Sequence, residues 1–362
     1  MTAHLILENG MTFTGEFFGA VGEAIGEVVF ATGMTGYLET LTDPSYHGQI
    51  ILQTFPLIGN YGVIPADFES ARVAATAYIV KQPCENPSNF RSEYNLDTFL
   101  KERGIVGLCG IDTRALARVI RGEGVMNGKI TTAPPTETDI AAVKAHTIKN
   151  AVAVVSRRDI LREEAMTTED ETSTGTTPDR RIALIDFGAK RGIAHALLER
   201  GCAVWSFPHD TPPEDILKIK PFGILLTNGP ADPADPANEN IIKNIRALQQ
   251  TGIPLFGICL GHQLLAMANG YKTRKLKFGH RGHNQPVRDV ASGRVYITSQ
   301  NHGYTVVADE SAFINVNDFS CEGLDYGRSF SVQFHPEAKG GPLDTAFLFD
   351  EFLRRCDAYA AG

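Results

Sequence analysis

The chain has 362 residues, enough for two or three domains, and its 43% hydrophobic and 21% charged residues are typical of a soluble globular protein. Its formal net charge of −8 argues against a partner that is nucleic acid or an anionic membrane. The first residues lack the charged and apolar blocks of a signal peptide, and no apolar run approaches the length of a membrane span.

The N-terminal half has the pattern of short strands with few helices. Residues 5–7 and 12–15 lie on either side of Asn9-Gly10, a dipeptide typical of hairpin turns, and predict a β-hairpin. Glycines are frequent, and helical patterns are clear only at residues 96–103 and 113–121. These features predict an α+β domain over residues 1–166.

Residues 167–179 are polar, rich in threonine and almost free of apolar side chains. Such a segment cannot offset its ordering entropy by burial. We therefore predict an interdomain linker here, with a long surface loop as the alternative.

The remaining residues, 180–362, alternate strands with helices. Apolar strand-like segments at 181–186, 203–207, 222–227 and 253–258 are separated by helical patterns such as 193–200 and 241–250. This alternation predicts an α/β domain with a doubly wound, mostly parallel sheet. Ligands of such sheets bind at the carboxyl ends of the strands, where Cys259 and the loop Asn228-Gly229-Pro230 both fall.

Cys259 follows the apolar strand directly and precedes a helical segment, the layout of a nucleophile elbow with sulfur in place of oxygen. Gly257 and Gly261 on either side would let strand and helix approach closely, and a helix N-terminus favours the thiolate. The six cysteines are scattered with no C-x-x-C pair, which disfavours a disulfide framework or zinc cluster and fits a reducing cytoplasm. For a lone cysteine, the alternative is a small core residue.

His335 is the best-placed base for this thiol. The strand-like residues 330–334 deliver it to a strand end, Pro336 keeps it extended, and Glu337 can accept its N–H and fix its tautomer. A surface turn is the alternative for His-Pro-Glu alone. Both motifs at strand ends of one sheet favour a Cys259–His335–Glu337 triad.

Acyl chemistry also needs donors for a developing oxyanion. The backbone N–H of Leu260, after the nucleophile, is one candidate. Pro230 has no N–H, so the neighbouring loop offers Gly229 or Ala231 as the second. The alternative for that loop is an ordinary glycine-proline turn.

The segment from Gly257 to Gln263, together with His335-Pro336-Glu337, resembles the class I glutamine amidotransferases. The likeness extends along nearly the whole chain, because further motifs in both halves resemble the small subunits of carbamoyl phosphate synthetase. The motifs that carry this second resemblance are 26–30, 32–37, 42–46, 110–114, 186–190 and 277–282.

The resemblance implies a glutaminase. Cys259 would attack the glutamine amide, His335 would pass the proton to leaving ammonia, and Glu337 would orient His335. The glutamine-binding residues implied are Ser45, Gly229, Ala231, Leu260, Gln263, Asn301, Gly303 and Tyr304. The family usually has glycine where Ala231 stands and phenylalanine where Tyr304 stands.

The resemblance also implies a cytoplasmic partner, the large synthetase subunit, which would use the ammonia with bicarbonate and ATP for arginine and pyrimidine biosynthesis. We expect no cofactor or metal on this chain, with ATP and Mg²⁺ on the large subunit. Gly128-Lys129 does not complete a phosphate-binding loop, because Glu123 and Ile130 replace the required glycine and serine or threonine.

His280 and His283 form a lone H-x-x-H, more consistent with a solvated or partner-facing loop than with a metal site. His302 is interpreted as a loop or partner residue, and Lys190 and Arg191 fit a pocket edge or a solvated turn equally well. The competing functions are a free-standing cysteine hydrolase or peptidase, another class I amidotransferase, and a non-catalytic scaffold.

Overall fold

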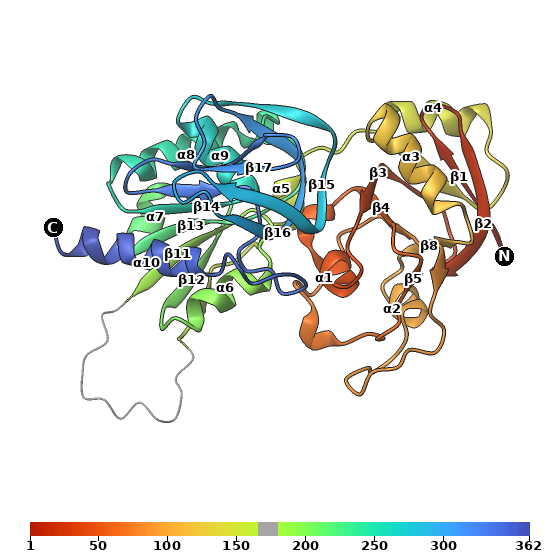
Figure 1. Ribbon diagram of the computed structural model, residues 1–362, viewed down its shortest axis with the longest axis horizontal. Coiled ribbons are helices and arrows are strands. Elements are labelled where there is room, and N and C mark those ends of the chain that lie inside the picture. Colours follow the sequence, from red (N-terminus) through yellow and green to blue (C-terminus); the bar gives the residue numbers. More distant parts are fainter. Residues whose placement is uncertain (166–179) are drawn as a thin grey trace. The chain divides into compact units, whose positions relative to one another are not determined.

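The computed structural model describes residues 1–165 and 180–362, which form two compact units (Figure 1). The first comprises residues 1–151 and 276–284, and the second comprises 152–275 and 285–362. The linker predicted at 167–179 lies outside the described residues. The exact ends of the predicted domains therefore stay predictions, although the structure groups 152–165 with the C-terminal unit and 276–284 with the N-terminal one.

The N-terminal unit is built on a closed barrel of seven strands in the order β1-β2-β8-β6-β4-β3-β9. The predicted hairpin is confirmed, since β1 and β2 pair antiparallel with Leu5 opposite Phe13. The barrel strands are β1 (Thr2–Leu7), β2 (Thr12–Gly19), β3 (Ala24–Ala31), β4 (Gln49–Gln53), β6 (Ala77–Ile79), β8 (Val106–Cys109) and β9 (Met126–Thr131), and a separate short pair is β5 (Leu57–Ile58) with β7 (Gln82–Pro83).

Helices accompany this barrel, as an α+β domain requires. The two predicted helices correspond to α2 (Leu96–Glu102) and α3 (Thr113–Glu123). Each begins at a capping side chain, because Asn95 accepts from the N–H of Thr98 and Asp112 from that of Ala115. The other helices of this unit are α1 (Tyr37–Thr42), η1 (Pro44–Tyr46), η2 (Pro65–Asp67) and α4 (Glu137–Ala145), whereas α5 (Ala151–Val155) lies almost wholly in the C-terminal unit.

A ten-stranded sheet forms the centre of the C-terminal unit, in the order β10-β12-β11-β13-β14-β19-β18-β17-β15-β16. Five neighbouring strands, from β12 to β19, are parallel, and antiparallel strands extend both edges. The strands are β10 (Leu161–Glu163), β11 (Arg181–Asp186), β12 (Ala203–Pro208), β13 (Gly223–Leu226), β14 (Leu255–Ile258), β15 (Lys272–Asp289), β16 (Val295–Val307), β17 (Phe313–Asn315), β18 (Cys321–Asp325) and β19 (Phe330–Val332).

Side chains of β11 alternate between two cores, which shows that both faces of the sheet are covered. Ile182 and Leu184 pack in one core with α6 and α10, whereas Ala183 and Ile185 pack in the other with α7, α8 and α9. The doubly wound fold is thus confirmed. These helices are α6 (Arg191–Leu198), α7 (Pro213–Leu217), η3 (Pro236–Asn238), α8 (Glu239–Gln250), α9 (Leu260–Ala268) and α10 (Phe347–Ala360).

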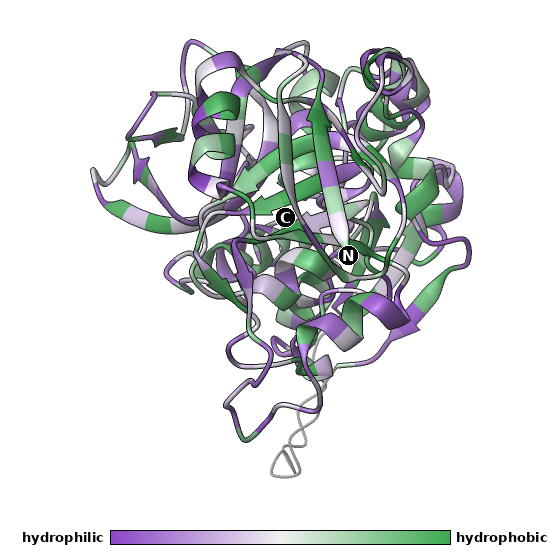
Figure 2. Ribbon diagram, turned by 90° about the vertical axis from the view of Figure 1, so that its right-hand side faces the viewer, coloured by the Kyte–Doolittle hydropathy of each residue, from purple (hydrophilic) through white to green (hydrophobic). Residues whose placement is uncertain are grey.

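Hydrophobic residues concentrate on the strands, and hydrophilic residues on the loops and outer helix faces (Figure 2). Within the described ranges, none of the helices combines the length and apolar character that crossing a bilayer requires.

Candidate active site

Cys259 lies at the junction of β14 and α9 with strained backbone angles, φ 54° and ψ −104°. Its N–H donates to the carbonyl of Val332 at 2.9 Å, and its side chain is buried. Glycine is required at both flanking positions, because there is no room for a Cβ atom. A Cβ on Gly257 would lie 2.7 Å from the carbonyl oxygen of Gly261, and one on Gly261 would lie 2.2 Å from that of Leu226. The predicted elbow is therefore present.

Strand order brings the other predicted groups to the same edge of the sheet. β14 lies between β13 and β19, and it runs parallel to both. The loop that begins at Asn228 follows β13, and His335 follows β19. The N–H of His335 donates to the carbonyl of Ser299 at 2.9 Å, which anchors the residue on β16.

His335 and Glu337 form a buried pair. The Nδ1 of His335 lies 2.6 Å from Oε1 of Glu337, and both side chains are almost fully shielded from solvent. The same Oε1 lies 3.3 Å from Nζ of Lys190, a contact that the sequence left undecided between a pocket edge and a solvated turn. Glu337 thus contacts two cationic groups, and Lys190 is part of the site.

The charges of this group set its protonation. Burial by itself lowers the pKa of His335, and so does Lys190, but Glu337 and Cys259 outweigh them and raise that pKa to about 9. Burial raises the pKa of Glu337, but His335 and Lys190 outweigh it and bring that pKa down to about 2. These opposite shifts favour an imidazolium facing a carboxylate, and Cys259 is close enough to contribute to the raised pKa of His335.

The thiol of Cys259 contacts β16, since its Sγ lies 3.6 Å from the carbonyl oxygen of Asn301. On His335, Nδ1 is taken by Glu337, whereas the buried Nε2 has no hydrogen-bond partner among the described residues. Nε2 is thus the ring nitrogen available for proton transfer. The catalytic role of each residue stays a prediction.

The oxyanion donors predicted from the sequence lie on adjacent elements. Leu260 is the first residue of α9, where an N–H has no partner within the helix. Gly229 packs so closely that a Cβ there would lie 2.3 Å from the carbonyl oxygen of Phe187. Both positions are compatible with the predicted role, which stays a prediction.

Of the glutamine-binding residues implied by the resemblance, Gln263 is the most constrained. Its Nε2 donates to the carbonyl of Tyr304 and to Oε1 of Gln333, both at 2.9 Å. Only its own Oε1 therefore remains for a ligand. Asn301, Gly303 and Tyr304 all lie on β16.

Ser45 belongs to the N-terminal unit, where it is buried in η1 and its N–H donates to Oδ1 of Asp43 at 2.9 Å. Its predicted part in glutamine binding stays a prediction.

The interpretation of His302 as a loop or partner residue is wrong, because the side chain is buried within β16. Its Nδ1 approaches the carbonyl of Tyr304 at 2.7 Å, and its Nε2 approaches Oε1 of Gln300 at 2.9 Å. Both ring nitrogens are therefore engaged with polar groups of β16 itself.

His280 and His283 were placed in a loop from the sequence, and this is also wrong, since both lie within β15. Period-two burial is weak in that strand, which runs from exposed to buried and back to exposed residues. A loop and a strand are therefore hard to tell apart from the sequence here.

Comparison with known proteins agrees with this geometry. Residues 5–130 match the family described as carbamoyl-phosphate synthase small chain, CPSase domain, and residues 183–355 match glutamine amidotransferase class-I. A Fusobacterium nucleatum protein named carbamoyl phosphate synthase small chain is 47% identical over 98% of each chain. The chain belongs to the carbamoyl phosphate synthase small-chain family.

Two Bacillus members of the family are equally similar. The carbamoyl phosphate synthase small chain of Bacillus caldolyticus is 48% identical and covers 98% of this chain and 96% of its own. The pyrimidine-specific small chain of Bacillus subtilis is 46% identical, with 98% and 95% covered. The family resemblance inferred from the sequence is confirmed.

In this member of the family, Ala231 adopts φ 75°, a left-handed conformation that favours glycine. That conformation costs an L residue about 1–2 kcal/mol, more than the roughly 0.5–1 kcal/mol of entropy that glycine loses on folding. We expect Ala231→Gly to raise the thermal midpoint by about 1–4 °C. Calorimetry checks this, with Ala234→Gly in the same loop as the control. A midpoint at or below that of the unchanged chain would show that the loop is not strained.

Lys190 is expected to tune the acid–base pair. Because its ammonium lowers the pKa of both His335 and Glu337, Lys190→Met should raise both values. His335 would release its proton less readily, and we expect the rate of glutamine hydrolysis to fall by about tenfold. NMR titration of the histidine ring and steady-state kinetics provide the two measurements.

Lys190→Met should also change how the stability of the fold depends on pH. The pKa of Glu337 is lower in the fold than in an unfolded chain, so its ion pairs stabilise the fold above pH 4.5, and that stabilisation is lost as the pH falls toward 2. Lys190→Met should therefore begin acid unfolding at a higher pH. Lys218→Met, which removes an exposed lysine paired with Asp215, should not. If acid unfolding began at an equally higher pH in both variants, Lys190 would not be part of the site.

Proposed function

We propose that the chain is the glutamine-hydrolysing subunit of a carbamoyl phosphate synthase. The observation that carries this proposal is the buried Cys259 at a strained elbow, with His335 and Glu337 at the end of the adjacent parallel strand. A non-catalytic scaffold subunit would not need this arrangement. The strained backbone at Cys259 would then destabilise the fold without serving any function.

The arrangement supports acyl transfer through a thioester. The thiolate of Cys259 adds to the amide carbon of glutamine, and the N–H groups of Leu260 and Gly229 stabilise the oxyanion. His335 protonates the departing nitrogen, which leaves as ammonia and gives the thioester on Cys259. The now neutral His335 accepts a proton from water, whose oxygen attacks the thioester and releases glutamate. Glu337 holds the ring by Nδ1 throughout, so that Nε2 carries each proton.

Ammonia would then pass to the large subunit, where ATP, Mg²⁺ and bicarbonate are expected to be consumed in carbamoyl phosphate synthesis for arginine and pyrimidine production. The relatives' designation as small chains supports a larger partner. A reducing cytoplasm fits the six cysteines, all of which are free.

The test is to combine the purified chain with its cognate large chain and to supply glutamine, ATP and bicarbonate. We expect co-purification of the two and carbamoyl phosphate synthesis from glutamine. Hydrolysis of glutamine without any effect of the large chain would favour another class of amidotransferase. Cleavage of peptides in preference to glutamine would favour the free-standing hydrolase.

A further inference from the structure

Three side chains along β19 and the residues that follow it face the start of α9. Ser331, Gln333 and His335 are spaced two residues apart, a spacing that places side chains on one face of extended backbone. Oγ of Ser331 lies 2.8 Å from Nδ1 of His262, and Cys259 helps to raise the pKa of His335. The residue between them, Gln333, belongs neither to the predicted triad nor to the implied glutamine-binding residues.

Gln333 pairs with Gln263, one of the implied glutamine-binding residues. Oε1 of Gln333 accepts from Nε2 of Gln263, and the same nitrogen donates to the carbonyl of Tyr304, both at 2.9 Å. A backbone carbonyl can only accept, so the Gln263 atom beside it must be the amide nitrogen. The second hydrogen of that nitrogen then points to Gln333, and both hydrogens of the Gln263 amide are used inside the chain.

The carbonyl of Tyr304 is held by a second contact. Nδ1 of His302 lies 2.7 Å from it, and Nε2 of the same ring lies 2.9 Å from Oε1 of Gln300. Gln300 in turn donates from its Nε2 to Oε2 of Glu322 at 2.9 Å. The contacts that hold the Tyr304 carbonyl therefore extend along β16 and reach the neighbouring β18.

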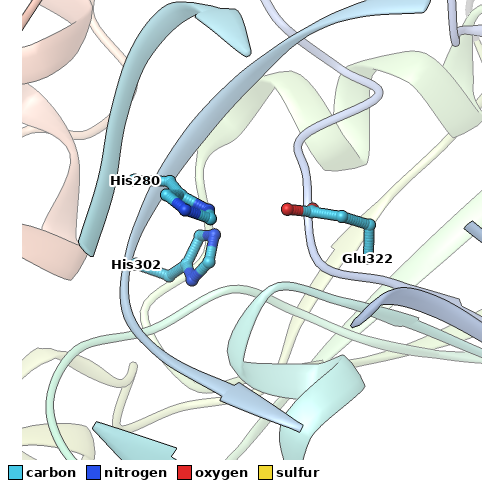
Figure 3. A group of neighbouring side chains, drawn as sticks. All are labelled: His280, His302 and Glu322. Atoms are coloured by element: carbon cyan, nitrogen blue, oxygen red, sulfur yellow. The ribbon is translucent and has the colours of Figure 1, made fainter. Parts of the chain in front are cut away.

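Glu322 joins this series of contacts to Gln333. Its carbonyl accepts from the N–H of Gln333 at 2.8 Å. Figure 3 shows the Glu322 carboxylate directed toward the His302 ring; the third side chain drawn, His280, belongs to the N-terminal unit. The two partners of the Gln263 amide are thus anchored through one closed series of hydrogen bonds.

The amide of Gln333 is better explained by a role in the site than by packing. The residue is fully buried, yet its Nε2 has no hydrogen-bond partner among the described residues. A buried donor without a partner destabilises a fold, and an apolar side chain of similar size would avoid that cost. What an apolar side chain would lack is the oxygen that accepts from Gln263.

We propose that Gln333 is a positioning residue for glutamine hydrolysis and acts through Gln263. It holds the Gln263 amide with its nitrogen turned into the chain, so that Oε1 alone is presented to the substrate and accepts from an N–H group of glutamine. An amide that could turn would also present its nitrogen, which repels such groups. Holding it in one orientation lowers the cost of binding. This inference rests on the proposed function, with glutamine as the substrate.

The first experiment measures steady-state glutamine hydrolysis by Gln333→Met, with the cognate large chain present. Methionine is close in size to glutamine but accepts no strong hydrogen bond, so the Gln263 amide loses an anchor. We expect KM for glutamine to rise about tenfold and kcat to stay within about twofold, because the lost contact serves binding and not the reacting atoms. Ser331→Ala is the matched control, since it removes the buried contact with His262 on the same face and should leave KM unchanged.

A double variant separates this role from a merely structural one. If Gln333 acts through Gln263, Gln333→Met should raise KM no further in a chain that already carries Gln263→Met. Additive rises in KM would overturn the proposal, and so would an unchanged KM in Gln333→Met or an equal rise in Ser331→Ala. If the unchanged chain hydrolysed no glutamine at all, the proposed function would fail first, and this inference with it.

Gln333→Glu tests the acceptor itself. Burial raises the pKa of a carboxyl group, so the new side chain stays protonated and presents a C=O and an O–H in place of the C=O and N–H of the amide. We expect KM to stay within about threefold of the unchanged chain. A rise as large as in Gln333→Met would show that the acceptor oxygen is not what matters. If Gln333→Met proves too unstable to assay, Gln333→Asn replaces it, because its amide is one carbon too short to reach Gln263.

Discussion

Replacing Cys259 by serine is expected to abolish glutamine-dependent carbamoyl phosphate synthesis by the assembled enzyme, with a loss of at least about 10³-fold. A serine hydroxyl ionises far less readily than a cysteine thiol, so the variant lacks an effective nucleophile. Synthesis from added ammonia should persist, because that reaction bypasses the glutaminase. A coupled assay with glutamine or ammonium as the nitrogen source measures both.

Cys321→Ser is the matched control, since Cys321 is another buried thiol of the C-terminal unit and burial raises its pKa. It should retain glutamine-dependent synthesis. Glutamine use that survived in Cys259→Ser would show that the nucleophile lies elsewhere, and loss of the ammonia reaction would point to a folding or assembly defect.

His335→Asn is expected to lower kcat for glutamine hydrolysis by about 10²–10⁴-fold. Asparagine can keep a hydrogen bond to Glu337 but cannot carry a proton to the leaving nitrogen. Asparagine is neutral, so the variant also loses the positive charge that the raised pKa of His335 gives this site. Alkylation of Cys259 should therefore be slower at neutral pH than in the unchanged chain.

His195→Asn, on the partly exposed face of α6, provides the comparison. We expect its kinetics and alkylation rate to match those of the unchanged chain. If His335→Asn retained hydrolysis at a similar rate, a different base would have to serve the thiol, and the triad would be wrong.

The parallel part of the C-terminal sheet could be predicted from the sequence, because β11, β12, β13 and β14 are apolar runs of four to six residues separated by helices. The long antiparallel strands β15 and β16 were not predicted. The barrel of the N-terminal unit could not be predicted either. Its strands β4, β6 and β8 are short, and closure depends on the pairing of β1 with β9, two segments more than a hundred residues apart. Local patterns predict the hairpin but not this distant pairing.

The candidate site could likewise be predicted only in part from the sequence. Cys259, His335 and Glu337 could be placed at strand ends because Gly257 and Pro336 impose local backbone conformations that residue type alone reveals. Lys190 could not be assigned from the sequence, because its contact with Glu337 forms only in the folded sheet. There, the residues that follow β11 and β19 lie at the same edge. Likewise, His302 is buried because β16 packs inside the folded unit. The residues next to it in the sequence do not indicate this burial.

The most direct measurement is to treat the chain with a glutamine-like electrophile and to map the modified residue by peptide mass spectrometry. We predict modification at Cys259 alone among the six cysteines, prevented by excess glutamine and strongly slowed in His335→Asn. Modification at another cysteine that glutamine protects equally well, with Cys259 unreacted, would contradict the claim that this thiol hydrolyses glutamine.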